Sequence, residues 1–440
     1  MKKNLLITMS GGTTSVINAT LAGIIRAAQK AGCIDRILAG YHGIKGVLAE
    51  SLIDLTGLTE NDLELLYYTP ASGFIGTTRV KPLGEDELTR LAEVFAAHDV
   101  GYFVNIGGNG TIKQSVSISK RLGAEVSIAA VPKTVDNDLG DAEFEKVLYT
   151  PGFPSCAQYW RHKVWIMNQE NLGAFSHDQV LITQTFGRKT GFLAGCARLG
   201  DIGRRIPLII LLPEDQRPLY EVLEYLKDTV TERSRAIVVL AEGYEIGDLG
   251  ERYDLSGQVM YGTSRTTGVQ LLVNHCADIG IQARGFVPGF DQRSDISFVS
   301  ALDLHRAHSL GKETVERLAA GESNFLASIA RRPGLPGEVE FVSVSFDETD
   351  DYSRVLRPEW ISYGNFDVTD EYICYVEPLI GSEQAPMVGV TEKPAFARCL
   401  GPNVEKRLIP SSSDFDSKRS LAREAEIASR YEAYAYGNEK

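Results

Sequence analysis

A short stretch of the chain places two carboxylates beside an amide. In Thr134-Val135-Asp136-Asn137-Asp138, two aspartates flank an asparagine. Magnesium prefers such hard oxygen ligands, and a carboxylate can also accept the proton of an attacking alcohol. Transfer of a phosphoryl group to an alcohol needs both, so one aspartate could be the base and the other a metal ligand. The alternative is an Asx turn or a helix cap, which is the commoner use of such clusters.

Two glycine-rich turns could bind the phosphate groups of such a reaction. Gly11 and Gly12 follow one apolar run, and Gly107-Gly108-Asn109-Gly110-Thr111 follows another. Glycine lets the backbone approach a phosphate closely, and a helix that begins there directs unpaired N–H groups at the anion. Either turn alone could simply end a strand, but both turns together with the acidic loop and Lys133 favour a phosphoryl-transfer site.

Arg79 closes another glycine-containing segment, residues 72–79, which has too few apolar residues for a core strand. The planar guanidinium of arginine is suited to paired hydrogen bonds with phosphate oxygens. Arg79 is therefore a candidate for binding a polyphosphate, with a surface role as the alternative.

Short apolar runs separated by helical patterns predict the elements that carry these loops. Residues 17–29 and 85–97 have apolar side chains at helical spacing. Such alternation indicates parallel sheets covered by helices, and ligands of these sheets bind beyond the carboxyl ends of the strands. The acidic loop and both glycine turns should therefore meet at one site. The predicted strands contain residues 5–7, 102–104, 128–131, 180–182, 208–212 and 237–240.

Composition and charge narrow the class of protein. The 440 residues are 43% hydrophobic and 23% charged, as in soluble globular proteins, and are too many for one ordinary core. The formal net charge of −13 disfavours nonspecific binding to nucleic acid or to an anionic membrane. The six cysteines include no CxxC pair, and neither a signal peptide nor a membrane-spanning run is recognisable, so we expect a soluble cytoplasmic protein.

The order of four motifs resembles that of the phosphofructokinases, over about residues 4 to 320. The motifs are Gly11-Gly12, Gly107-Gly108-x-Gly110-Thr111, Pro132-Lys133-Thr134-Val135-Asp136-Asn137-Asp138, which is the most specific, and Phe186-Gly187-Arg188. The resemblance implies an α/β fold of two doubly wound parallel-sheet lobes, interleaved within residues 1–330.

The rest of the chain, residues 331–440, is expected to form a C-terminal accessory segment. It begins at the proline- and glycine-rich stretch 331–337, which indicates a linker or a hard turn. Beyond this stretch the pattern alternates at 342–346 and becomes charged and helical at 417–434.

The resemblance implies roles around the acidic loop. Asp136 would be the base that removes the proton from the 1-hydroxyl of fructose 6-phosphate, and Asp138 would lie close to magnesium. Thr134 would contact the transferring phosphoryl group, and Arg188 would stabilise the transition state. Asn109 stands where the family usually has a magnesium-binding aspartate; its amide oxygen can still be a ligand but carries no negative charge.

The resemblance also implies a site for the sugar. Phe186, followed by Gly187, stands where a methionine usually touches the sugar, and Glu242 matches a glutamate that binds sugar hydroxyls. Arg284 and Arg293, nine residues apart, resemble basic residues that hold the sugar and its distal phosphate. The first of these usually reaches in from a neighbouring subunit, which implies a homodimer or homotetramer.

Two departures from the family bear on the acceptor. Phe290 stands where a histidine or tyrosine is common, and Gln179 stands where relatives often have a cation for the distal phosphate. Loss of that cation weakens the binding of a dianion. Fructose 6-phosphate is the expected acceptor, with another sugar phosphate, or a sugar with a different distal group, as the alternative.

Two residues of the donor site argue for different donors. In the family, glycine at the position of Gly110 leaves room for the α-phosphate of ATP, whereas lysine at the position of Lys133 is common in pyrophosphate-using relatives. Residues 10–18 also resemble bacterial pyrophosphate enzymes. We favour ATP, because room for a phosphate is harder to mimic than a mobile cation. The predicted donor-binding residues are Gly11, Gly12, Arg79, Gly108, Gly110, Thr111 and Lys133.

Two further hypotheses belong to other classes of function. Asn109 and Gln179 would suit a regulatory paralogue that binds a sugar phosphate without turning it over. A dinucleotide-binding protein is disfavoured, because no convincing G-x-G-x-x-G follows the first predicted strand.

Overall fold

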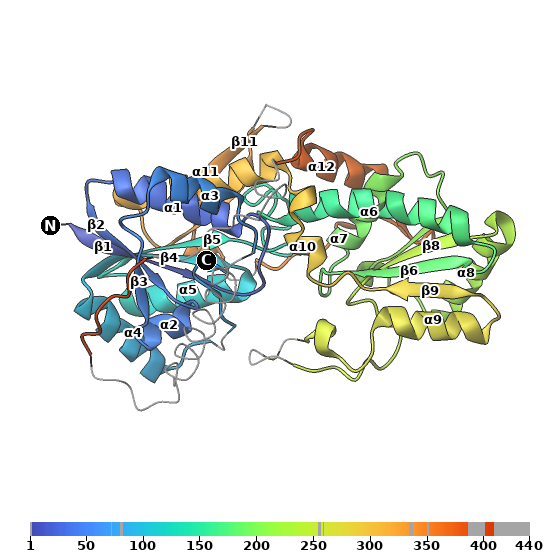
Figure 1. The fold of residues 1–440 in the computed structure, drawn as a ribbon, viewed down its shortest axis with the longest axis horizontal. Helices are drawn as coiled ribbons and strands as arrows, with labels where there is room; N and C mark the ends of the chain where they lie inside the picture. The colour runs from blue at the N-terminus through green and yellow to red at the C-terminus, as the bar shows by residue number, and fades with distance from the viewer. Residues whose placement is uncertain are drawn as a thin grey trace, which may run out of the picture.

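The computed structural model describes residues 2–71, 73–79, 82–253, 257, 259–333, 338–349, 352–385 and 401–408. They form two α/β lobes, each built around its own sheet (Figure 1). The chain leaves the first lobe at helix α6 (Phe153–Ala174) and returns to it with α11 (Ala301–Ala319). Both lobes therefore depend on segments that lie far apart in the sequence.

The larger sheet has seven strands in the order β11-β10-β5-β4-β1-β2-β3. Its five central strands are parallel, whereas β3 and β11 pair antiparallel at the two edges. Parallel neighbours need long crossover connections, which the helices supply. The strands are β1 (Lys3–Met9), β2 (Ile34–Gly40), β3 (Leu52–Asp54), β4 (Val100–Gly107), β5 (Ser127–Pro132), β10 (Phe325–Arg331) and β11 (Val339–Ser345).

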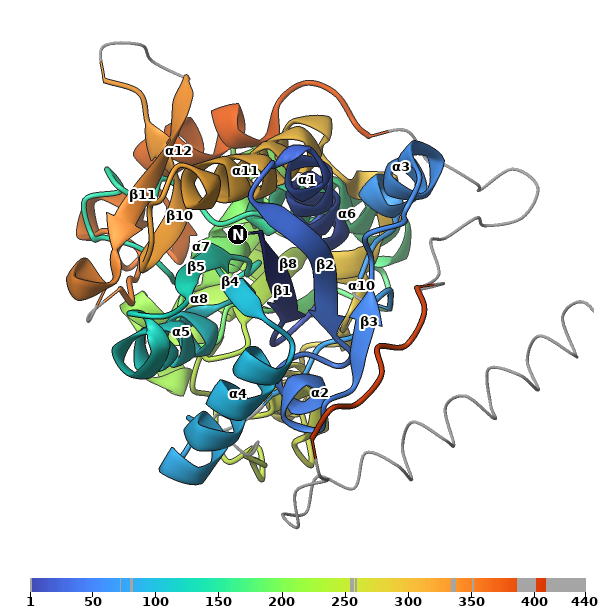
Figure 2. The same ribbon diagram turned by 90° about the vertical axis from the view of Figure 1, so that its left-hand side faces the viewer.

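The larger sheet lies between two layers of helices (Figure 2). Alternate residues of its central strands are buried in different clusters, one on each face. Leu5 and Ile7 of β1 are buried in one hydrophobic cluster, and Leu6 is buried in another. This two-residue period is what a strand buried on both faces requires. One layer consists of α1 (Ile17–Lys30), α3 (Glu60–Tyr68) and α11, and the other of α2 (Ile44–Leu48), α4 (Glu85–Ala97) and α5 (Asn109–Leu122).

The smaller sheet is entirely parallel, in the order β7-β8-β6-β9. Helix α6 packs on one face, and α8 (Leu219–Arg233) and α9 (Gly268–Asp278) cover the other. Figure 1 shows that the parallel strands of both sheets run toward the middle of the molecule. The strands are β6 (Val180–Thr185), β7 (Leu208–Leu211), β8 (Ala236–Ala241) and β9 (Ala283–Phe286).

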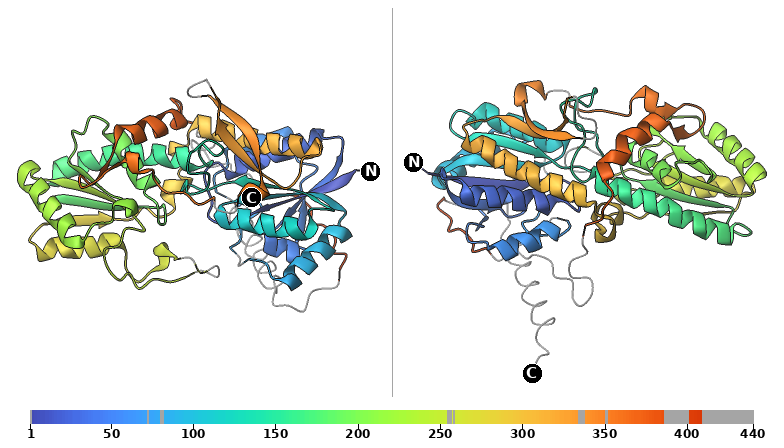
Figure 3. Two further views of the ribbon diagram at one scale, coloured as in Figure 1. Left: turned by 180° about the vertical axis from the view of Figure 1, so that it is seen from behind. Right: turned by 90° about the horizontal axis from the view of Figure 1, so that it is seen from above.

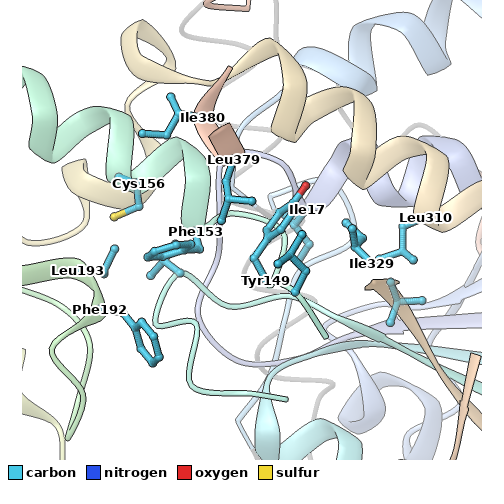
Figure 4. Packing of buried hydrophobic residues seen from close by; sticks show 14 of the residues in the cluster. Ile17, Tyr149, Phe153, Cys156, Phe192, Leu193, Leu310, Ile329, Leu379 and Ile380 are labelled. Atoms are coloured by element: carbon cyan, nitrogen blue, oxygen red, sulfur yellow. The ribbon is translucent and has the colours of Figure 1, made fainter. Parts of the chain in front are cut away.

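One hydrophobic cluster belongs to both lobes (Figure 4). It includes Ile7 of the larger sheet and Leu181 of the smaller one, together with Phe153 and Phe192. Leu379 of α12 (Asp370–Ile380) joins the same cluster, and α12 packs along α6 (Figure 3). This shared core fixes the two lobes relative to each other. The remaining short elements are α7 (Phe192–Gly195), α10 (Asp291–Ser294), β12 (Ile361–Ser362) and β13 (Asp367–Val368).

Residues 401–408, here called the C-terminal strap, bind along the edge strand β3 (Figure 2). The amide of Asp54 donates to the carbonyl of Pro402 at 3.0 Å, and the amide of Val404 donates to the carbonyl of Leu52 at 2.8 Å. These bonds occupy backbone groups that an edge strand would otherwise leave unpaired.

Glu50 anchors the far end of the strap. Its buried carboxylate accepts hydrogen bonds from the amides of Arg407, at 2.6 Å, and Leu408, at 3.1 Å, and lies 2.7 Å from the ring of His98. Burial by itself raises the pKa of Glu50, but the hydrogen bonds from Arg407, His98 and Leu408 outweigh it, so the pKa lies below its ordinary value. The anchor is therefore an ionised carboxylate.

All six predicted strands and both predicted helices are present. The alternating run at 342–346 lies largely within β11, so the predicted boundary after residue 330 falls inside the β10–β11 hairpin, and the predicted accessory segment begins as a part of the larger sheet. The helix predicted at 417–434 lies outside the described residues.

No helix in the described part of the chain is long and apolar enough to cross a membrane. The cysteines of that part are free thiols, at positions 33, 156, 196, 276 and 374.

Glu50→Gln is expected to loosen the strap. The neutral amide loses hydrogen bonds to a charged acceptor, which are worth about 1.5–3 kcal/mol each. Hydrogen exchange at the amides of Val404, Arg407 and Leu408 should accelerate. Acid should act similarly, because the pKa of Glu50 is lowered from 4.5: its stabilising contribution is present above that pH and is lost as the pH falls through the folded value.

Glu316→Gln is the matched control, because the carboxylate of Glu316 pairs with Lys312 within α11 and not with Glu50 or the partners of Glu50. Its strap amides should exchange at the wild-type rate. Strap amides that exchange equally slowly in Glu50→Gln would contradict the anchoring role of Glu50.

Candidate active site

Strands of both sheets end around one cavity of about 430 Å³. Loops that follow β1, β5, β6 and β8 form its walls, as expected for ligands of parallel sheets. Twelve of the predicted site residues line it, namely Gly11, Gly12, Arg79, Gly108, Lys133, Thr134, Asp136, Phe186, Arg188, Glu242, Phe290 and Arg293.

Asp136 and Arg188 both line the cavity and form an ion pair, with one residue from each lobe. Nε of Arg188 lies 3.5 Å from Oδ2 of Asp136, and the two side chains are 41% and 13% exposed. The hydroxyl of Thr134 accepts a hydrogen bond from the amide of Asp136 at 3.2 Å, which tightens the turn. The site thus places a proton acceptor beside a fixed positive charge.

Backbone strain marks the loops that carry both residues. Asn137, Gly187 and Arg188 have φ angles of 57°, 128° and 54°. A left-handed conformation is costly for a residue other than glycine and persists only where the surroundings hold it. Part of the support comes from Glu242, whose carboxylate accepts a hydrogen bond from the amide of Arg188 at 3.0 Å.

Three cations approach the first glycine turn closely. A Cβ atom on Gly12 would lie 2.7 Å from Nη1 of Arg293 and 3.7 Å from Nη2 of Arg79. Gly11 has a φ of 78°, and Nζ of Lys133 donates to the carbonyl of Gly12. A turn without side chains, surrounded by positive charge, suits a polyanion.

Two of these cations are short of negative partners. Burial lowers the pKa of Lys133 to about 7, Arg293 adds to the effect, and Asp136 opposes it. Burial, and then Arg79, also lowers the pKa of Arg293, and its buried Nε finds no hydrogen-bond acceptor among the described residues. A bound phosphate would supply the charge that both side chains lack.

Helix α5 begins at Asn109, directly after Gly108 at the cavity wall. The positive end of its dipole is therefore close to the site. A Cβ atom on Gly107 would lie 2.1 Å from Oγ1 of Thr111, so only glycine fits where the chain enters this helix. Gly110 and Thr111 lie in the first turn, outside the cavity lining.

Asn109 and Asp138 form a pair near Asp136. Nδ2 of Asn109 donates to Oδ2 of Asp138 at 3.3 Å, while the buried Oδ1 of Asn109 has no donor among the described residues. Burial, and then the charge of Asp136, raises the pKa of Asp138. Within the described ranges, no three His, Cys, Asp or Glu side chains form a metal-binding group. The pair therefore fits a metal that takes its remaining ligands from phosphate and water.

Glu242 and Phe186 contribute the wall from the second lobe. Burial raises the pKa of Glu242 to about 8, and the charge of Asp136 adds to the effect. The carboxyl group can then donate as well as accept a hydrogen bond at neutral pH, which suits sugar hydroxyls. The guanidinium of Arg293 lies 5.2 Å from the ring centre of Phe186, and Phe290 is 69% exposed at the rim.

Arg284 lies apart from the cavity, in β9. Its side chain is 64% exposed and pairs with the carboxylate of Asp178 at 2.8 Å. Oε1 of Gln179 accepts a hydrogen bond from the amide of Gln282 at 3.3 Å. Neither Arg284 nor Gln179 lines the cavity of its own chain.

Sequence reasoning missed the segment 259–263, which also lines the cavity. Burial, and then the charge of Glu242, raises the pKa of Tyr261 in this segment. The segment has no helical or strand period to mark it. Its position in the long connection between β8 and α9, after a strand end that carries Glu242, is the one signal that could have drawn attention to it.

The comparisons with known proteins agree with this arrangement. The family model described as Phosphofructokinase matches residues 4–318. The pyrophosphate–fructose 6-phosphate 1-phosphotransferase of Methylococcus capsulatus is 30% identical over 428 residues, covering 93% of this chain and 99% of the relative. The ATP-dependent 6-phosphofructokinase of Persephonella marina is 28% identical over 285 residues, covering 61% and 81%.

A solved structure agrees in fold as well. The crystal structure of the pyrophosphate-dependent phosphofructokinase from Nitrosospira multiformis superposes with a TM-score of 0.82 at 28% identity, covering 94% of this chain and 100% of that chain. The predicted resemblance is thus confirmed in both sequence and fold over most of the length, and the chain belongs to the phosphofructokinase family.

Proposed function

We propose that this chain transfers a phosphoryl group from pyrophosphate to the 1-hydroxyl of fructose 6-phosphate. The observation that carries the proposal is the position of Asp136, at the cavity wall and 3.5 Å from the guanidinium of Arg188. An alcohol that attacks phosphorus must lose a proton while the charge of the phosphate is stabilised. A base and a cation side by side serve both needs.

In this mechanism Asp136 accepts the proton of the 1-hydroxyl while that oxygen bonds to the nearer phosphorus of pyrophosphate. The bond from this phosphorus to the bridging oxygen breaks, and the second phosphate leaves with the electron pair. Arg188 and Thr134 stabilise the phosphoryl group during transfer, and Lys133 and Arg79 hold the leaving phosphate. The products are fructose 1,6-bisphosphate and phosphate.

Magnesium would be held by Asp138 and Asn109. The buried Oδ1 of Asn109, for which the described residues offer no donor, and the carboxylate 3.3 Å from its Nδ2 supply suitable oxygens. When bound there, the ion would neutralise the charge of the phosphates.

Pyrophosphate is favoured as the donor by Lys133 and by the relatives. The enzymes of Methylococcus capsulatus, Rhodospirillum rubrum and Xanthomonas campestris, named for pyrophosphate, are 29–30% identical over at least 86% of this chain. Lys133 is buried beside the first glycine turn, where it could bind the leaving phosphate of pyrophosphate. Gly110, which led to the prediction of ATP, leaves open space but has no side chain that could bind a phosphate. ATP is therefore kept as the alternative donor.

A sugar with another distal group is the second candidate acceptor. The sulfofructose kinase of Alkalicoccus urumqiensis is 24% identical over 362 residues, covering 80% of this chain. Gln179 replaces a cation, and Arg284 is already paired with Asp178. A singly charged distal group needs fewer cations than a dianionic phosphate does.

A homo-oligomer is part of the proposal. Arg284 can bind the distal group only in the cavity of another chain, because it does not line its own. Large apolar side chains are also exposed in the second lobe, with Phe290 at 69% and Trp165 of α6 at 60%. A second subunit would cover such side chains.

Asp136→Asn is expected to lower kcat by about 10²–10⁴-fold, because the amide cannot accept the proton. The KM values should change little, since the size and hydrogen-bonding reach of the side chain are kept. The assay measures phosphorylation of the 1-hydroxyl in the presence of magnesium. Each donor is tested with fructose 6-phosphate and with sulfofructose as the acceptor.

Two outcomes would count against the proposal. Wild-type protein that turns over no acceptor with either donor, while still binding fructose 6-phosphate, would favour the regulatory paralogue. An Asp136→Asn variant with wild-type kcat would remove Asp136 from the role of base.

Lys133→Met is expected to raise the KM for pyrophosphate about ten- to hundredfold, the loss of one charged hydrogen bond. Because the pKa of Lys133 is lowered to about 7, the wild-type KM for pyrophosphate should also rise as the pH increases above 7 and the ammonium loses its proton. This dependence should be absent from the variant. Lys113→Met, which removes an exposed lysine of α5, is the control. A Lys133→Met variant with the wild-type KM for pyrophosphate would contradict the assignment of pyrophosphate as the donor.

Hybrid oligomers should test the contribution of Arg284. Arg284→Ala and Asp136→Asn should each be nearly inactive alone, whereas a mixture reassembled from both should regain activity, because one chain supplies Asp136 and its neighbour supplies Arg284. Light scattering gives the oligomeric state of the same samples. An active monomer, or a mixture no more active than its components, would overturn the prediction.

A further inference from the structure

A segment near the end of the described chain runs alongside the backbone that follows the acidic loop. The amide of Gly140 donates to the carbonyl of Tyr352 at 2.8 Å, and the amide of Arg354 donates to the carbonyl of Asp138 at 3.0 Å. Leu139 and Ser353 form an antiparallel bridge between these two bonds. The acidic loop is therefore paired with residues more than 200 positions later in the sequence.

The side chain of Arg354 reaches back to the residue between the two aspartates. It is only 4% exposed, and its Nε and Nη2 donate to the backbone carbonyl and to Oδ1 of Asn137, at 2.9 and 2.8 Å. Nη1 donates to the carbonyl of Val147, and the guanidinium stacks 3.9 Å from the ring centre of Phe144. All three nitrogens thus bond to carbonyl oxygens, and two of these belong to one residue.

Tyr375 binds the NH2 group of the Asn137 side chain, whereas Arg354 binds its oxygen. Its hydroxyl accepts from Nδ2 of Asn137 at 2.9 Å and donates to the carbonyl of Leu148 at 2.8 Å. The ring is stacked 4.6 Å from that of Trp360, which restricts its movement. Oδ1 of Asn137 also accepts from the amide of Thr150 at 3.2 Å.

Asn137 is fully buried and has a left-handed φ of 57°. Because this conformation is unfavourable for a residue with a side chain, the contacts around it must hold it in place. A rotation at Asn137 would turn the carboxylates of Asp136 and Asp138 relative to each other. The direction of both carboxylates therefore depends on what binds Asn137.

We propose that Arg354 and Tyr375 are positioning residues, which hold Asn137 so that Asp136 is aligned with the acceptor hydroxyl. The inference rests on the proposed function for the role of Asp136. Neither residue lines the cavity, so both act through Asn137. Misplacement of a base by about 1 Å can lower a rate by about 10²-fold.

Three variants test the role. Tyr375→Phe removes only the hydroxyl and leaves the stacked ring. Arg354→Lys keeps the charge, but its point-like ammonium cannot serve the two oxygens of Asn137 with the fixed geometry of a guanidinium. Arg354→Gln removes the charge as well. We expect kcat to fall at least about tenfold in each, least in Arg354→Lys, while the KM for fructose 6-phosphate stays within about threefold of wild type.

Two neighbours provide matched controls. Tyr372, one turn earlier in α12, donates its hydroxyl to the carbonyl of Phe192 and does not contact the acidic loop. Arg357 lies over the same Phe144 ring but donates to the carbonyls of Ala142 and Glu143. Tyr372→Phe and Arg357→Gln should therefore keep kcat within about twofold of wild type. The loss of thermal stability in Tyr372→Phe should be similar to that in Tyr375→Phe, because both rings are buried.

Hydrogen exchange of the amides at 134–141 provides a readout independent of activity. Exchange should accelerate in Tyr375→Phe and Arg354→Gln but not in the controls. The proposal is overturned if Tyr375→Phe matches Tyr372→Phe in both kcat and exchange, or if KM rises while kcat is unchanged. If Arg354→Gln does not fold, the other two variants decide. Absence of wild-type turnover would contradict the proposed function alone. The exchange data would still test whether Arg354 and Tyr375 hold Asn137 in place.

Discussion

A hydrophobic core shared by both sheets is the constraint on which the cavity depends. The loop that carries Asp136 follows a strand of one sheet, and the loop that carries Arg188 follows a strand of the other. The distance between these two residues therefore depends on how the lobes pack. Phe153 and Phe192 lie in the cluster that contains residues of both sheets. A core divided in two would let the lobes move independently, and a separation of 3.5 Å between charged groups would not be kept.

The cavity concentrates positive charge in a chain whose net charge is −13. Lys133, Arg79 and Arg293 crowd around one glycine turn, and burial of the first and last disfavours their charged forms. Such a site is unfavourable when empty and becomes favourable once a polyanion binds. Because the chain as a whole is negatively charged, this cluster of cations is where an anion would be attracted rather than repelled.

Local pattern was enough to predict six of the strands, two helices and the loops that meet at the cavity. Apolar runs mark buried parallel strands because both of their faces are covered, and glycines mark places where the backbone has no room for a Cβ atom. The hydrogen bonds that hold Asn137 could not be predicted, because Arg354 and Tyr375 are 217 and 238 residues away from it in sequence. Hydrogen bonds over such distances leave no periodic signal, and neither does the irregular segment 259–263. The family resemblance already implied that Arg284 would lie outside its own cavity, but its ion pair with Asp178 could be seen only in the structure.

The return of the chain to its first sheet has a consequence for biosynthesis. Strands β10 and β11 complete one side of that sheet, and residues 401–408 cover the opposite edge. The second lobe also receives a late segment, because Phe366 lies in its core. During synthesis neither lobe can therefore be completed before the residues after 320 emerge. Until residues 325–345 and 401–408 are made, the nascent sheet has two open edges. Chaperones that bind unpaired strands would be needed most during this interval.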